Sequence, residues 1–301
     1  MARRGTSGLA RIALASILFG FSSIFIRLAH DHGANVSAVL TVRAAAVLPW
    51  VALLAVGRHR ASALRAWRQL VPMGLLAAVN VFTFVLAVSR MSPALVALIY
   101  YAYPVLVIAG AHLLGWSRFE TFTGLAALTT LLGVAVTIGL PHGRVDGFAV
   151  FLSLLNASGY AAYILFAEVA MRRATAAASF AFVAGVSSLL LLAGSLSAGA
   201  HFPYGGPGVA SLAALFVSLF FPHVLVLSGI GRIGGPWGSL VSCLEVVTTV
   251  AATALILDLP LGAGAIAGGA LILVGGVAAP IVASQRARIP LELAQDPSKR
   301  V

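Results

Sequence analysis

Long, unbroken apolar stretches recur from one end of this sequence to the other. A helix needs roughly 20 mostly apolar residues to cross about 30 Å of hydrocarbon. The stretches are continuous rather than alternating, so they predict helices and not strands. Ten stretches qualify: residues 9–29, 36–56, 70–89, 92–113, 121–139, 147–167, 177–199, 208–228, 236–257 and 262–284. The sequence therefore predicts an all-α polytopic membrane protein with ten transmembrane helices.

The composition excludes an ordinary soluble domain. Of the 301 residues, 60% are hydrophobic and 9% are charged, whereas a soluble domain carries roughly 25% charged residues. The net charge of +11 would indicate a nucleic-acid partner only if the basic residues clustered on one solvated face. They are instead distributed among the loops, so we predict no nucleic-acid partner.

The basic residues divide unequally between alternate loops. With a cytoplasmic N-terminus, the inner side receives fifteen of them, and the other side receives only Arg27, Arg43, Arg90 and Arg144. This positive-inside bias predicts that both termini are cytoplasmic, with residues 1–8 as a short N-terminus and residues 285–301 as a tail. The first apolar stretch is then an uncleaved helix and not a signal peptide. Because arginine far outnumbers lysine, we expect a bacterial inner (plasma) membrane protein.

Two parts of the chain repeat the same landmarks at the same spacing. The landmarks are Pro104, Trp116 and Gly133 in the first part and Val246, Asp258 and Gly275 in the second. Both intervals between successive landmarks are identical in the two parts. Five crossings per half would reverse the orientation of the second half. We therefore predict two inverted-topology repeats of five helices, residues 9–139 and 147–284.

Short motifs also follow one another in a characteristic order. They are Leu18-Phe19-Gly20-Phe21-Ser22-Ser23, Thr41-Val42-Arg43, the segment 87–94, Tyr103-Pro104-Val105 and Leu244-Glu245-Val246. In this order they resemble the EamA-like family of the drug/metabolite transporter superfamily. The resemblance implies a five-plus-five helix transporter, with efflux of amino acids or related metabolites as the expected activity. The chain departs from the family where Val246 replaces a proline, and where Gly115-Trp116 and Leu257-Asp258 replace Gly-Glu.

Glu245 is the only charged residue between Pro236 and Leu257. It lies about ten residues into its predicted helix, roughly 15 Å along the axis and therefore near mid-membrane. An ionisable group at that depth costs about 2.5 to 3.5 kcal/mol on insertion scales, which makes it a functional candidate. Glu245 could couple transport to protons, or it could hydrogen-bond a neighbouring helix and fix packing. In the aligned halves it stands opposite Tyr103.

Other polar and aromatic residues within the predicted spans are candidates for contacting a substrate. They are Arg43, Asn80, Tyr100, Tyr103, Asn156, Tyr160, Tyr163, His223 and Trp237. The spacing places Asn156, Tyr160 and Tyr163 on one helix face, which could line a cavity. Tyr100 and Tyr103 also share a face, and Tyr101 is expected to point elsewhere.

Each of these residues also has an ordinary structural interpretation. The tyrosines could simply pack and hydrogen-bond between helices. Arg43 could offer two donors to a substrate carboxylate, or it could extend its guanidinium to the lipid headgroups. His223 could titrate, or it could satisfy a neighbouring carbonyl group.

Missing motifs narrow the function classes. The sequence has no Gly-rich phosphate loop ending in Gly-Lys-Ser/Thr and no metal-ligand spacing of histidines, so no cofactor or metal is expected. Asn156-Ala157-Ser158-Gly159 is only faintly similar to a serine-protease signature, and an enzyme is not expected. We predict a secondary transporter of a small metabolite that works by alternating access, with protons as a candidate coupling ion. The alternatives are a lipid scramblase or flippase and a non-transporting membrane bundle; the oligomeric state is not predicted.

Overall fold

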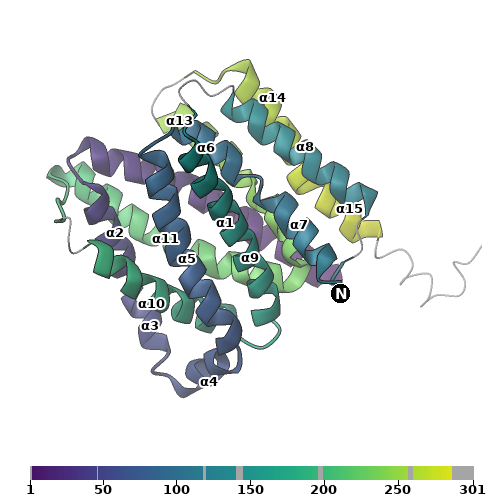
Figure 1. Ribbon diagram of the computed structural model, residues 1–301, viewed down its shortest axis with the longest axis horizontal. Coiled ribbons are helices and arrows are strands. Elements are labelled where there is room, and N and C mark those ends of the chain that lie inside the picture. Colours follow the sequence, from purple (N-terminus) through teal and green to yellow (C-terminus); the bar gives the residue numbers. More distant parts are fainter. Residues whose placement is uncertain are drawn as a thin grey trace, which may run out of the picture.

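The computed structural model describes residues 2–45, 47–117, 120–139, 145–195, 199–256 and 260–286. Within these ranges every regular element is a helix (Figure 1). Some residues that the sequence singles out lie outside the described ranges: Leu257, Asp258, Arg118, Arg144 and residues 287–301 of the tail. The all-α fold class predicted from the sequence is therefore confirmed for the described residues.

The helices fall into two series along the chain. The first series is α1 (Ala2–Asp31), α2 (Val36–Ala45), α3 (Leu48–Leu53), α4 (Gly57–Arg65), α5 (Trp67–Val88), α6 (Pro93–Tyr100), α7 (Tyr103–Leu113) and α8 (Thr121–Ile138). The second is α9 (Gly147–Ala170), α10 (Ala176–Ser195), α11 (Gly205–Ile233), α12 (Gly235–Ser242), α13 (Leu244–Ile256), α14 (Ala263–Ile272), the π-helix η1 (Leu273–Ala278) and α15 (Ala279–Arg286).

Among the described residues, eight helical spans are long and apolar enough to cross a membrane. They are Gly5–Asp31, Val36–Leu53, Trp67–Val88, Pro93–Leu113, Thr121–Ile138, Gly147–Ala170, Gly235–Ile256 and Ala263–Ala283. The predicted spans 177–199 and 208–228 overlap α10 and α11, whose described apolar segments are shorter: Ala176–Leu192, Gly205–Leu215 and Phe221–Ile233. The number of ten crossings therefore stays a prediction. Helix α4 is an addition to the predicted elements, because its polar sequence carries no apolar run.

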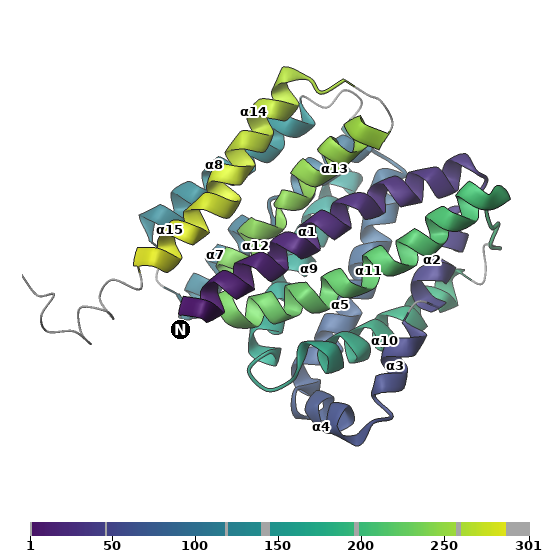
Figure 2. The same ribbon diagram turned by 180° about the vertical axis from the view of Figure 1, so that it is seen from behind.

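The longest pairing joins the first helix to a helix far away in the sequence. Figure 2 shows α1 and α11 side by side over most of their lengths. Glycines permit the approach, since a Cβ on Gly229 would lie 3.0 Å from the carbonyl oxygen of Gly8. Hydrogen bonds from arginines to serines also join the pair, with Arg11 donating to Ser228 (3.0 Å). Helices α5 and α9 form a second extensive pair.

Helix α8 approaches α14 and η1 through contacts that are related by a constant sequence shift. Gly133 lies against Gly268, where a Cβ would be 2.7 Å from the carbonyl oxygen. Gly275 lies against Ala126, where a Cβ would be 2.5 Å from the carbonyl oxygen. Ala126 and Gly268 are 142 residues apart, and so are Gly133 and Gly275. Exchanging the two halves of the chain therefore exchanges the two contacts.

The same sequence shift relates helix starts and interruptions in the two series. Helix α6 begins at Pro93 and α12 begins at Gly235, which is 142 residues later. Helices α8 and α14 begin at Thr121 and Ala263, with the same shift. The shift also relates Tyr101 and Cys243, which lie at the interruptions that follow α6 and α12. Arg90 and Arg232 are related in the same way. Each of these arginines contacts a residue near the start of the opposite half: Asp146 at 3.8 Å and Ser7 at 2.9 Å. The same sequence shift thus relates helix boundaries and contacts as well as the spacing of single residues.

The close approach of α8 to η1 leads to a stability prediction. We expect Gly275→Ala to destabilise the protein by about 1 to 3 kcal/mol, because the added Cβ meets backbone and the Thr130 hydroxyl at 2.5 Å. The measurement is the apparent melting temperature of the purified chain in detergent. Gly147→Ala is the matched control, since no atom lies within 4 Å of its new Cβ. Equal melting temperatures for the two variants would contradict the close contact.

Candidate functional site

Five tyrosines gather where α6, α7 and α9 meet. The Tyr103 and Tyr160 rings are 4.8 Å apart and nearly perpendicular, and Tyr100 lies 5.3 Å from Tyr103 and 5.6 Å from Tyr160. Tyr163 stacks on Tyr160 at 5.8 Å with an interplanar angle of 8°. These separations fall within the range in which aromatic pairs attract one another. The structure therefore brings together all four tyrosines predicted from the sequence as site candidates.

The fifth member, Tyr101, corrects one expectation. A regular helix would turn Tyr101 away from Tyr100 and Tyr103. Its ring instead lies 5.3 Å from Tyr100 and 6.3 Å from Tyr103. The reason is that the helix is interrupted between α6 and α7, so the spacing of an uninterrupted helix does not apply there.

The first interruption follows from the sequence. Pro104 has no backbone N–H and cannot donate to the carbonyl group four residues earlier, which belongs to Tyr100. Tyr101 has ψ 4° and Ala102 has ψ −12°, and Ala102 donates to Ile99, three residues back. These are the features of a tight 3₁₀ turn.

The second interruption, at Cys243, occurs without a proline. In a regular helix the Cys243 N–H would bond to the carbonyl group of Ser239. That carbonyl accepts instead from the Tyr103 hydroxyl (3.2 Å), and the Cys243 N–H donates to Leu240 (3.2 Å). A hydrogen bond between the two halves thus supports the interruption where the family pattern has a proline.

Glu245 lies in the first turn of α13, immediately after this interruption. It is within electrostatic reach of Tyr100, Tyr101 and Tyr160. Among the described residues, its carboxylate has no hydrogen bond or ion pair. Glu245 and the three tyrosines are half-buried, whereas Tyr103 and Cys243 are buried. The site therefore combines an unpaired carboxylate with a wall of aromatic rings.

The two asparagines are placed beside the tyrosines, but they act differently. Asn156 is buried, and its Nδ2 donates to the Asn80 carbonyl group and to the Thr83 hydroxyl (3.0 Å), so it holds α9 to α5. Asn80 Oδ1 lies against Gly159 and has no hydrogen-bond partner among the described residues. Asn156 therefore ties α9 to α5, and Asn80 has an unpaired side-chain oxygen beside Gly159.

The other three candidates lie on α2, α11 and α12. Arg43 is half-buried on α2, and its guanidinium has no ion pair or hydrogen bond among the described residues. His223 packs between two aromatic rings, 4.8 Å from Phe19 and 5.2 Å from Phe180. Trp237 on α12 packs 6.2 Å from Phe122.

A further group of contacts joins the ends of α7 and α9 to the start of α12. Glu168 accepts from the backbone N–H of Gly235 (2.7 Å), the first residue of α12, and pairs with Arg172 (3.3 Å). The Arg172 guanidinium lies 5.9 Å from the Trp116 ring. We refer to Trp116, Glu168, Arg172 and Gly235 as the end clasp. None of its residues is among the predicted site residues. The sequence feature that could have indicated the end clasp is Glu168, an acidic residue directly after the predicted span 147–167.

Comparisons with known proteins agree with this architecture. Residues 6–139 match the EamA-like transporter family, which confirms the resemblance predicted from the sequence. Twenty-nine chains of solved structures match. One, a crystal structure described only as that of a protein, has a TM-score of 0.77 and 18% sequence identity, and the match covers 94% of this chain and 99% of the other. This likeness shows the fold alone. No curated protein matches the chain.

The interruption at Cys243 can be tested by supplying the missing proline. Val246 lies in the first turn of α13, and its N–H donates to the Cys243 carbonyl group three residues back (3.0 Å), so a proline removes that one bond but costs less than the about 3 kcal/mol that it carries inside a helix. We expect Val246→Pro to lower the melting temperature much less than Ala162→Pro, which lies in the uninterrupted part of α9. Equally severe losses from both variants would show that α12 and α13 form a regular helix.

Proposed function

We propose, from the premise that residues 6–139 match the EamA-like transporter family, that this chain is a secondary transporter for a small metabolite. The match supports a membrane transporter of the drug/metabolite type. The single observation that carries the proposal further is the site itself. An unpaired carboxylate and a tyrosine cluster meet at two helix interruptions that occupy equivalent positions in the two halves of the chain.

The topology that we propose has ten crossings as two inverted repeats of five. The constant sequence shift between helix starts, interruptions and glycine contacts supports it. In such architectures the substrate is held between the repeats near the membrane midplane, often at discontinuous helices. With both termini cytoplasmic, the end clasp would lie on the inner side of a bacterial plasma membrane.

The residues at the site suggest a class of substrate. Aromatic rings suit an apolar or aromatic group, and Glu245 can attract an amino group. We propose an amino acid or a related amine with an apolar side chain, exported from the cell. Tyr100, Tyr101, Tyr103 and Tyr160 would contact the apolar part, and Glu245 would exchange a proton or bind the amine. We assign no contact with the substrate to Arg43, His223 or Trp237.

A transport screen tests the proposal. The purified chain is reconstituted into proteoliposomes, and uptake of labelled amino acids, amines, nucleosides and drugs is measured with and without a pH gradient. We expect saturable uptake of at least one apolar amino acid or amine. Fluorescent lipids are followed in the same vesicles, because lipid movement without solute uptake would favour a scramblase. Vesicles that move neither solutes nor lipids would contradict transport altogether.

Glu245 gives a prediction about coupling. If the carboxylate carries the proton, Glu245→Gln should make uptake independent of the pH gradient while leaving the melting temperature and expression unchanged. Glu120→Gln, an exposed acid at the start of α8, is the matched control and should behave as the natural chain does. Uptake by Glu245→Gln that still follows the gradient would exclude a proton-carrying role.

The end clasp gives a prediction about access. Cys243 is the only cysteine and is buried beside Tyr103, so its labelling by a maleimide reports access to the centre. Loss of the Glu168 cap and ion pair should loosen the inner ends of α9 and α12. We expect Glu168→Ala to raise the labelling rate about threefold or more, because a rate change of this size corresponds to the free energy that is lost with a helix cap. Glu120→Ala should leave the rate unchanged, and an unchanged rate in Glu168→Ala would show that the clasp does not restrict access.

A further inference from the structure

The short helix α4 is firmly attached to the rest of the molecule. Figure 2 shows it at the edge of the bundle, between α3 and α5. Ser62 on its inner face accepts from the backbone N–H of Thr175 (3.0 Å), just before α10, and Ala63 and Ala66 are buried. These contacts fix which face of α4 points outward.

Helix α4 and the start of α5 carry an uncompensated positive charge. Arg58, Arg60, Arg65 and Arg68 are exposed. The sequence contains no aspartate or glutamate between Asp31 and Glu120, and none of the described ion pairs involves these four arginines. A basic segment of this kind next to a membrane span attracts anionic lipid, with about 1 kcal/mol for each arginine near the surface.

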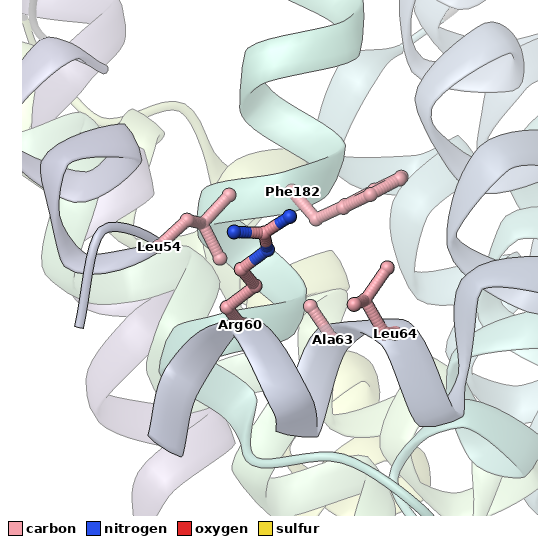
Figure 3. A pocket seen from close by; sticks show the side chains of 5 residues that line it. All are labelled: Leu54, Arg60, Ala63, Leu64 and Phe182. Carbon is pink, nitrogen blue, oxygen red and sulfur yellow. The ribbon is translucent and has the colours of Figure 1, made fainter. Parts of the chain in front are cut away.

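A pocket lies under this charge, between α4, the end of α3 and α10. It has a volume of about 320 Å³, and its walls are Leu54, Arg60, Ala63, Leu64 and Phe182. Figure 3 shows the Arg60 guanidinium extending from α4 between Leu54 and Phe182. The pocket therefore offers one charged donor group above mostly apolar walls.

The residues next to the pocket are those of a membrane interface. Leu64 is 53% exposed and Trp67 is 50% exposed, and the Arg68 guanidinium lies 5.8 Å from the Trp67 ring. Tryptophan is enriched at the level of the lipid headgroups, and arginine can reach them from there. These residue types suit a position beside the headgroups and the first acyl carbons.

We propose that this pocket is a binding site for an anionic phospholipid. The lipid phosphate pairs with the Arg60 guanidinium, which can donate two parallel hydrogen bonds to it. An acyl chain lies against Leu54, Leu64 and Phe182. A soluble phosphate would gain nothing from these apolar walls, and a zwitterionic lipid would bring no net charge to the arginines. The lipid joins α4 to α10 and is separate from the tyrosine site.

Native mass spectrometry of the full chain in detergent tests the site. The chain is titrated with palmitoyl-oleoyl-phosphatidylglycerol, with phosphatidylcholine of the same acyl chains, and with glycerol 3-phosphate as the soluble headgroup. We expect phosphatidylglycerol to bind about tenfold more tightly than phosphatidylcholine, and glycerol 3-phosphate not to bind. Equal binding of the two lipids, or binding of glycerol 3-phosphate as tight as that of the anionic lipid, would overturn the proposal.

Variants distinguish the pocket from a diffuse charge effect. Arg60→Gln should weaken phosphatidylglycerol binding roughly fivefold or more, and Phe182→Ala should weaken both lipids. Arg58→Gln removes the same charge from the same helix, but Arg58 does not line the pocket, so its effect should be clearly smaller. Melting temperatures close to that of the natural chain confirm that the variants are folded. Equal losses in Arg60→Gln and Arg58→Gln would show that the arginines act only as a charged surface.

Discussion

The cost of an unpaired backbone group in hydrocarbon governs this structure. Because lipid cannot hydrogen-bond to N–H or C=O groups, the chain satisfies them within helices, and the helices then associate through close packing rather than through a hydrophobic force. Gly8 with Gly229, and Gly133 with Gly268, are places where backbones approach closely. The interruptions between α6 and α7 and between α12 and α13 are therefore exceptions that need support from elsewhere in the molecule.

That support links the two halves of the chain. Pro104 interrupts the first helix through its own chemistry. At Cys243 no proline is present, and the Tyr103 hydroxyl occupies the Ser239 carbonyl that a regular helix would use. Tyr103 and Glu245 are 142 residues apart, so equivalent positions carry an aromatic hydroxyl in one half and a carboxylate in the other. In the transporter that we propose, this difference between the halves would suit a substrate with one apolar part and one charged part.

Much of this fold can be predicted from the sequence, because length and hydropathy identify membrane helices. The tyrosines at 100, 103, 160 and 163 can be selected by residue type and spacing. Tyr101 cannot, because the helix period fails at an interruption, and the second interruption depends on a contact between distant residues. Helix α4 and Glu168 escape prediction because both lie where the sequence is polar, and polar ends of spans look like ordinary loops. The bonds from Asn156 to α5 also cannot be predicted, because they depend on which helix packs against this face of α9.

The central claim is that cargo binds between the two helix interruptions. The most direct measurement is a structure of the chain with a compound that it transports. We expect that compound to lie between the α6–α7 interruption and the start of α13, with its apolar part against Tyr100 and Tyr160 and its charged group near Glu245. A transported compound bound on the lipid-facing surface, or at any place from which these residues are remote, would contradict the account.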